Sequence, residues 1–182
     1  MEALYKNIHQ EIIDQCKQGN QKAQFQMYKL YYKAMYSISL RIVNDEMEAE
    51  DVMQEAFLNA FNKIETYKGE VSFGAWLKKI VVNRSLDYLK KRKVQFEEVN
   101  EKTAQILDYQ MGTKEIDLNS IKTAIKSLPD GYRVVLSLYL IEGYDHEEIS
   151  QILGITNSAS RTQFLRAKNK LREILKDKEI FS

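Results

Sequence analysis

The sequence predicts an all-α protein made of two small helical domains joined by an acidic linker. Only one proline and seven glycines, the two residue types that interrupt helices, occur among 182 residues. Apolar residues recur at helical spacing along most of the chain, and side chains that cap helices stand at the ends of these runs. The predicted domains are residues 1–93 and 119–182, with the linker at 94–118.

Four helices are predicted in the first domain. They cover residues 2–17, 21–43, about 46–64 and, after a loop at 66–71, the stretch that ends near Lys93. Asn20 follows a glycine and is placed to cap the second helix, and Asp45 with Glu48 forms a D-x-x-E capping box for the third. The loop contains Gly69, and Ser72 is placed to cap the fourth helix.

Four helices are also predicted in the second domain. They cover a short run from Ile121 to Leu128, then about 130–142, 146–153 and about 158–176. Pro129 fits the first turn of its helix, where a missing N–H costs nothing, and Gly143 ends that helix. Asp145 and Glu148 form a second capping box, and Gly154 allows a sharp turn. The linker loses the apolar period, although a partial helix is expected around 103–111.

Several classes of protein are excluded by composition. Cys16 is the sole cysteine, so no internal disulfide forms and a reducing compartment fits. His9 and His146 lie too far apart in sequence to have metal-ligand spacing, so no metal site is expected. Neither a signal-peptide core nor an apolar run long enough to span a membrane is present, which predicts a cytoplasmic protein without membrane insertion of its own. Without a phosphate loop or a nucleophile motif, we expect no catalytic residues, no cofactor and no enzymatic activity.

Charge is segregated along a chain whose net charge is only +1. Residues 44–55 carry six acids and no base, whereas residues 78–93 carry seven bases and one acid. Residues 161–178 carry seven bases and two acids, and the linker carries six acids and two bases. Two separate basic helices, one in each domain, indicate a protein that holds nucleic acid at two places.

Residues 145–170 have the pattern of a helix-turn-helix. In the second helix Ser160, Phe164, Ala167 and Leu171 share one face, which leaves Arg161 and its neighbours toward solvent. Such a helix fits the major groove of duplex DNA, where an arginine can make a bidentate contact with guanine. The alternative is a basic surface helix in an αα-hairpin, which the turn, the caps and the arginine placement make less favourable.

The basic stretch 73–93 differs because it has no turn-helix pair of its own. Tyr67, Phe73 and Trp76 lie close to its cations, and aromatic rings beside cations suit unstacked bases. The alternative places Phe73 and Trp76 in the core and treats the final lysines as a solvated helix end. Asn83, next to Arg84, is expected to need a polar partner because its amide lies within an apolar run.

The acidic stretch continues into a helix with two distinct faces. Val52 and Phe57 should face the core, whereas Asp51, Gln54 and Glu55 lie on the outer surface. This surface is either a docking site for a basic protein helix or an ordinary solvated face, and spacing alone favours the solvated face.

Three segments together resemble one family. They are AEDVMQEAFLNAF (49–61), FGAWLKKIVVNRSLDYLKKRK (73–93) and LPDGYRVVLSLYLIEGYDHEEISQILGITNSASRTQFLRAKNKL (128–171). In this order and at these separations they resemble the small extracytoplasmic-function class of bacterial RNA polymerase sigma factors, over roughly 20–93 and 120–176. The resemblance implies three partners: the largest subunits of core RNA polymerase, promoter DNA and an anti-sigma factor.

The resemblance also implies roles for individual residues. Core polymerase binding is implied for Asp51, Gln54, Glu55 and Asn59. Contact with the minus-ten element is implied for Tyr67, Lys78, Lys79, Asn83, Arg84, Lys90, Lys91 and Arg92, with loop 66–72 as the loop that captures a flipped base. Contact with the minus-thirty-five element is implied for Ser158, Arg161, Thr162, Leu165, Arg166 and Lys168.

The sequence departs from the family pattern at the start of the last helix. Ser160 stands where the family often has valine, which predicts looser packing there, and Asn157 with Ser158 replaces a common Glu-Gly pair. The base preference of the family is therefore not transferred to this chain.

Two other functions compete with this interpretation. An ordinary helix-turn-helix regulator would explain 145–170 but would leave the basic helix at 73–93 without a role. A helical adaptor without any role on nucleic acid predicts that Arg161→Ala and Arg166→Ala leave function intact.

Overall fold

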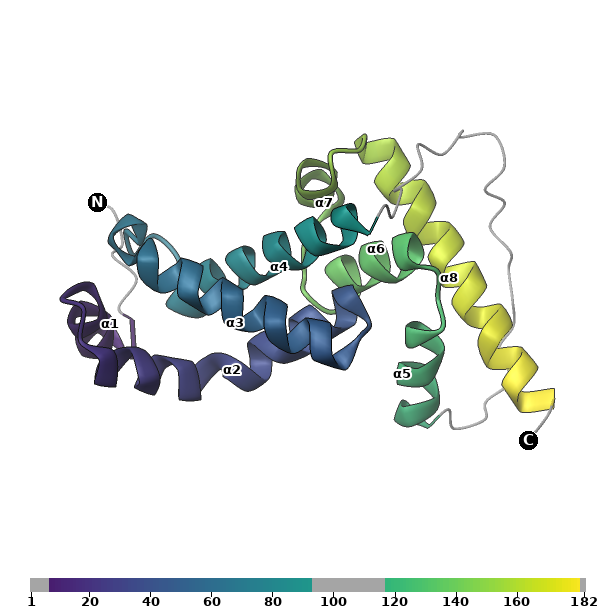
Figure 1. Cartoon of the computed structure of the whole chain (residues 1–182). Coiled ribbons are helices and arrows are strands. Elements are labelled where there is room, and N and C mark those ends of the chain that lie inside the picture. The colour runs from purple at the N-terminus through teal and green to yellow at the C-terminus, as the bar shows by residue number, and fades with distance from the viewer. Residues whose placement is uncertain (1–6, 93–116, 181–182) are drawn as a thin grey trace. The chain divides into compact units, whose positions relative to one another are not determined.

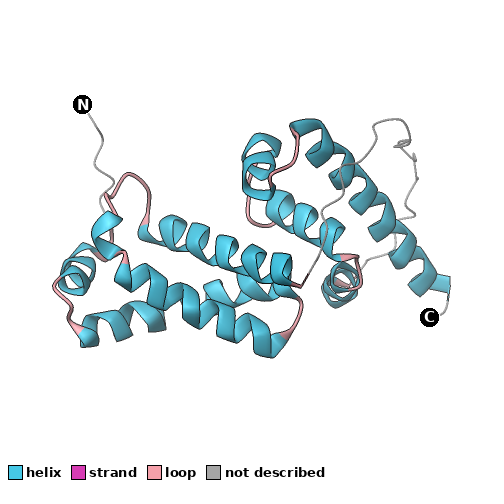
Figure 2. Ribbon diagram, turned by 45° about the horizontal axis from the view of Figure 1, so that its top comes forward, coloured by secondary structure: helices cyan, strands magenta, loops and turns pink. Residues whose placement is uncertain are grey.

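The computed structural model describes residues 7–92 and 117–180, which belong to two compact units, Met1–Arg92 and Lys93–Ser182. Within these residues the chain is helical, with loops between the helices and no strand, as Figure 2 shows. The all-α fold class predicted from the sequence is confirmed. The predicted linker lies outside the described residues up to 116, as does the partial helix expected at 103–111. No helix in the described ranges is both long and apolar enough to cross a membrane.

Residues 7–92 of the first unit form four α-helices and one short 3-10 helix (Figure 1). They are α1 (Gln10–Lys17), α2 (Gln21–Val43), α3 (Glu46–Asn62), η1 (Ile64–Thr66) and α4 (Phe73–Lys91). Helices α2, α3 and α4 pack against one another, and α1 packs on α2 and η1. The first helix was predicted to start at residue 2, but α1 starts at Gln10, and Ile8 before it is 89% exposed.

Polar side chains cap the helices of this unit where the sequence predicts them. The Asn20 side chain accepts a hydrogen bond from the N–H of Ala23, and Ser72 accepts one from the N–H of Ala75. Asp45 caps α3 by accepting from the N–H of Glu48 at 3.0 Å. These bonds satisfy donors that the first turn of a helix leaves without a partner, and they fix where each helix begins.

The second unit contains α5 (Leu118–Lys126), α6 (Asp130–Leu140), α7 (His146–Leu153) and α8 (Asn157–Ile180). Both arms of the predicted capping box between Asp145 and Glu148 are present, and α7 has the predicted bounds. Gly154 has φ +68, a left-handed conformation that ends α7 and turns the chain toward α8. Pro129 was predicted in the first turn of α6, but it is the residue before that turn, because α6 begins at Asp130.

A buried charge fixes the turn between α5 and α6. Arg133 is 1% exposed and forms an ion pair with Asp130 at 2.6 Å. It also donates a hydrogen bond to the carbonyl oxygen of Leu128 at 3.3 Å. A buried guanidinium is stable only with such partners, so this contact set holds the entry to α6 in one geometry.

Candidate nucleic-acid interface

Helix α8 divides into a packed face and a polar face. Ala167 is fully buried against Leu128 and Leu136, with Phe164 and Leu171 packed beside it. The residues predicted to contact the minus-thirty-five element are exposed or half-buried: Ser158, Arg161, Thr162, Leu165, Arg166 and Lys168. Helices α7 and α8 pack against each other across the Gly154 turn, which is the arrangement of a helix-turn-helix.

A chain of polar contacts holds the start of α8. The Asn157 side chain donates to a carboxylate oxygen of Glu147 at 3.1 Å and accepts from Nε of Arg161 at 2.8 Å. The hydroxyl of Thr156 accepts from the N–H of Ala159 at 3.0 Å. Arg161 is exposed, yet its side chain is held at the N-terminal end of the helix. An arginine oriented in advance loses less side-chain entropy when it binds a base.

An aromatic and polar cluster lies beneath this helix start. The His146 ring stacks on Tyr139 with ring centroids 4.5 Å apart and meets the Phe164 ring at 5.6 Å. Its Nδ1 lies 2.9 Å from the hydroxyl oxygen of Ser160, which is fully buried. The expectation of looser packing at Ser160 is therefore wrong, because Ser160 is fully buried and His146 of α7 gives its hydroxyl a hydrogen-bond partner.

The environment of His146 makes the second unit sensitive to acid. Burial lowers the pKa of His146 below its usual 6.5, and the positive charge of Arg161 lowers the pKa further, against a smaller opposing effect of Asp145. As the pH falls below about 6.5, His146 is protonated in the unfolded chain before it is protonated in the folded chain. Acid therefore stabilises the unfolded state relative to the folded state.

We expect the melting temperature of the protein to fall as the pH is lowered below about 6.5. In His146→Gln the contribution of the histidine is absent, so the fall should be smaller. Glutamine keeps a polar group near Ser160 but does not titrate. Thermal unfolding followed by circular dichroism at a series of pH values measures the difference. An identical pH dependence in both proteins would contradict the role given to His146.

Helix α4 presents a row of polar side chains along one side. Lys79, Asn83, Asp87 and Lys90 follow one another at helical spacing and are all exposed, whereas Val81 and its neighbours are buried. Among the other residues predicted to contact the minus-ten element, the structure places Lys91 and Arg92 at exposed positions and Lys78 and Arg84 at half-buried ones.

The expectation that Asn83 lies deep in an apolar run and needs a partner is wrong. Its amide faces solvent, because the apolar residues around it belong to the opposite side of α4.

Tyr67 does not offer its ring to the solvent, contrary to the expectation of a surface aromatic. It is 3% exposed, and its ring packs against those of Phe73 and Trp76, with ring centroids 5.5 Å and 5.3 Å away. Its hydroxyl donates to the carbonyl oxygen of Val71 at 2.7 Å. Tyr67 is therefore an internal anchor of loop 66–72, whose first residue is the last of η1. The alternative that Phe73 is a core residue agrees with its full burial.

Helix α3 turns its acidic side outward. Asp51, Gln54 and Glu55 are exposed and Asn59 is half-buried. The opposite side of the helix is buried through Val52, Met53, Ala56, Phe57 and Ala60. The four residues predicted for polymerase binding thus share one accessible surface on a rigid helix.

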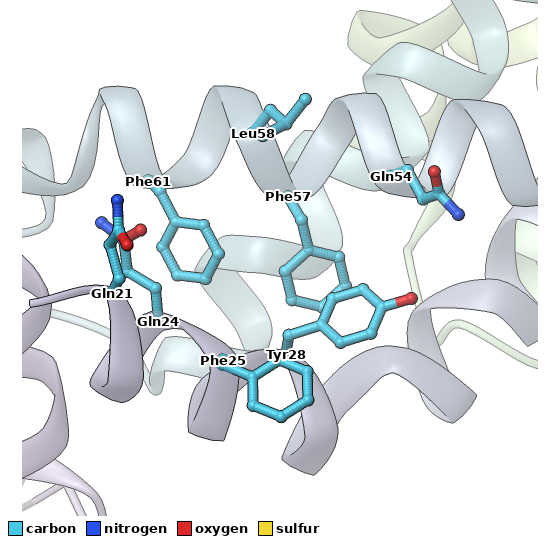
Figure 3. A pocket seen from close by; sticks show the side chains of 8 residues that line it. All are labelled: Gln21, Gln24, Phe25, Tyr28, Gln54, Phe57, Leu58 and Phe61. Atoms are coloured by element: carbon cyan, nitrogen blue, oxygen red, sulfur yellow. The ribbon is translucent and has the colours of Figure 1, made fainter.

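An apolar groove lies beside this surface, and sequence reasoning missed it. Figure 3 shows the rings of Phe57 and Phe61 directed from α3 toward Tyr28 and Phe25 of α2. The groove is lined by Gln21, Gln24, Phe25, Tyr28, Gln54, Phe57, Leu58 and Phe61. Phe25 is 59% and Leu58 is 65% exposed. The spacing of Leu58 from Gln54 and Glu55 would have placed it on the predicted docking surface.

Comparisons with known proteins match both units. A family model described as Sigma-70 region 2 matches residues 27–94, and one described as Sigma-70, region 4 matches residues 118–171. The chain is 29% identical to the ECF RNA polymerase sigma factor SigW of Bacillus subtilis, over 91% of this chain and 95% of that protein. It is 27% identical to the ECF RNA polymerase sigma-E factor of Escherichia coli K12, over 92% of this chain and 96% of that protein.

Solved structures show the same fold. The sigma factor RpoE from Bartonella quintana, in complex with the anti-sigma factor NepR, aligns with a TM-score of 0.57 at 22% identity, over 83% of this chain and 95% of that one. CnrH in complex with the cytosolic domain of CnrY aligns with a TM-score of 0.54 at 22% identity, over 91% and 96%. Both sigma-70 regions occur in sequence order on the two helical units, and the chain belongs to the extracytoplasmic-function class of RNA polymerase sigma factors.

Proposed function

We propose that this sigma factor is a dissociable promoter-specificity subunit with three separate binding surfaces. The outward side of α3 binds the clamp coiled coil of the largest subunits of core RNA polymerase. The polar face of α8 reads the upstream minus-thirty-five element as duplex DNA. Loop 66–72 and the basic side of α4 hold the unpaired strand of the minus-ten element.

The observation that carries this proposal is the separation of charge onto different helices. Asp51 and Glu55 project from α3, whereas Lys79, Lys90 and Arg161 project from α4 and α8. Opposite charges on separate rigid helices suit one protein partner and one nucleic-acid partner at the same time. Binding to the unpaired strand shifts the equilibrium toward the open promoter, so the chain acts by binding alone, without chemistry of its own.

An anti-sigma factor is the proposed regulator, and the cytoplasm is the proposed site of action. The support is the fold shared with RpoE and CnrH, whose structures contain NepR and the cytosolic domain of CnrY. A regulator that covers the α3 surface or the α8 face would block the two contacts on which initiation depends.

Run-off transcription with purified core polymerase on a promoter library tests the function. We expect specific transcripts from wild type and fewer from Arg161→Ala and Asn83→Ala.

Because acids offset bases over the whole chain, we expect weak DNA binding by the free protein and tight binding with polymerase, as measured by gel shift. Tight binding to a palindrome without polymerase would support an ordinary regulator instead. Intact function in Arg161→Ala and Arg166→Ala variants would support a helical adaptor.

A further inference from the structure

Tyr67 joins loop 66–72 to the N-terminal part of the chain. The side-chain amide of Asn7 donates to the Tyr67 hydroxyl at 2.5 Å, and that hydroxyl donates onward to the carbonyl oxygen of Val71. Lys17 Nζ donates to the carbonyl oxygen of Tyr67 at 3.1 Å and lies 6.0 Å from the centre of its ring. Tyr67 thus bonds to Val71 within the loop. It also joins the loop to Asn7 and Lys17, the two ends of segment 7–17, which contains α1.

This segment precedes the part of the chain that matches Sigma-70 region 2, which starts at residue 27. Asn7 is nonetheless buried, and α1 packs on η1 immediately before the loop. A buried amide loses its hydration and is stable only with a partner, so the bond to Tyr67 selects one position of the loop over others.

The outer side of the loop is open. Lys68, Glu70 and Val71 are exposed, and Gly69 has φ +77 with no atom within 4 Å of the position that a Cβ would occupy. The loop is therefore fixed from the inside by Asn7, Lys17 and Tyr67 while its outer side remains accessible to a ligand.

We propose that Asn7 and Lys17 are positioning residues that act through Tyr67 to set the base selectivity of loop 66–72. The inference rests on the proposed function, in which this loop contacts an unpaired promoter base. A loop held in its binding conformation discriminates between bases better, because a wrong base cannot be accommodated by movement of the backbone. The segment around α1 thereby becomes a specificity element outside the family-matched region.

The test uses polymerase holoenzyme assembled with the full chain and a library of fork-junction DNAs that carry a randomised unpaired strand. A photoreactive residue introduced at Glu70 identifies the base that the loop contacts. Tyr67→Phe removes the hydroxyl and keeps the ring, Asn7→Ala removes the donor, and Lys17→Met removes the charge and keeps the stem. We expect the base preference at the crosslinked position to fall about three- to tenfold in each variant, with preferences elsewhere unchanged.

Ser85→Ala is the matched control, because it breaks a buried hydrogen bond to Ser39 in the same unit and does not touch the loop. Ser85→Ala should lower the melting temperature about as much as Tyr67→Phe does, because each change removes one buried hydroxyl. It should leave the base preference intact. An unchanged preference in Tyr67→Phe and Lys17→Met, with the wild type selective at that position, overturns the inference alone. A wild-type holoenzyme that forms no crosslink to any unpaired base overturns the proposed function together with the inference.

Discussion

The Asp51→Lys/Glu55→Lys variant is expected to bind core polymerase more than about 100-fold less tightly than wild type. Both carboxylates are exposed on α3, beside a groove with apolar walls. In the proposed complex they face a basic helix, and reversing their charge places like charges together, which costs several kcal/mol. Competition between variant and labelled wild type for purified core enzyme measures the change.

Glu11→Lys/Asp14→Lys is the control, because it makes the same change in net charge at exposed positions on α1 of the same unit. It should compete nearly as well as wild type. Asp51→Asn/Glu55→Gln separates charge from shape and should give an intermediate loss. Equal affinity of the two charge-reversed variants would show that α3 is not the polymerase-binding surface.

Local sequence signals were sufficient for most of the fold. Asp145 and Glu148 lie three residues apart, and Gly154 follows the last periodic residue of α7, so the bounds of that helix could be predicted from adjacent positions alone. The start of α2 was predicted correctly for the same reason, since Asn20 follows a glycine and caps the helix. Helical periodicity likewise identified the outward sides of α3 and α8.

Contacts between distant residues account for what the sequence did not predict. The buried hydroxyl of Tyr67 accepts a hydrogen bond from Asn7, 60 positions away, and no periodicity within 66–76 reveals that contact. Ser160 was placed on the packed face of its helix, but its partner His146 lies 14 positions away on another helix, and no local pattern pairs the two. Asn83 was misplaced for another reason: it follows three apolar residues in sequence, but the turn of the helix carries it to the opposite side. Tertiary packing decided the positions of Tyr67, His146 and Ser160, whereas helical periodicity decided that of Asn83.

The Arg161→Ala/Arg166→Ala variant removes two arginines from the N-terminal half of α8. In the proposed function both arginines contact bases, and each such contact is worth about 1–3 kcal/mol of discrimination, so their removal should lower transcription from a promoter with an intact upstream element about 100-fold. The loss should be specific for sequence, because these side chains lie on the accessible face of α8 and Arg161 is already oriented by Asn157. Run-off transcription on promoters with single substitutions in the upstream element measures both rate and preference.

Lys170→Ala/Arg172→Ala removes the same charge from the same helix, about one to three turns farther along. Lys170 pairs with Glu173 and Arg172 with Asn169, so the loss there should be small, equal for all sequences and visible mainly as a weaker dependence on salt. The two variants distinguish a helix face that contacts bases from one that contacts only phosphates. Only for a face that contacts bases does the effect of removing arginines depend on the promoter sequence. If Arg161→Ala/Arg166→Ala keeps the wild-type preference among promoters while losing activity, α8 is a phosphate-binding helix and does not read the sequence.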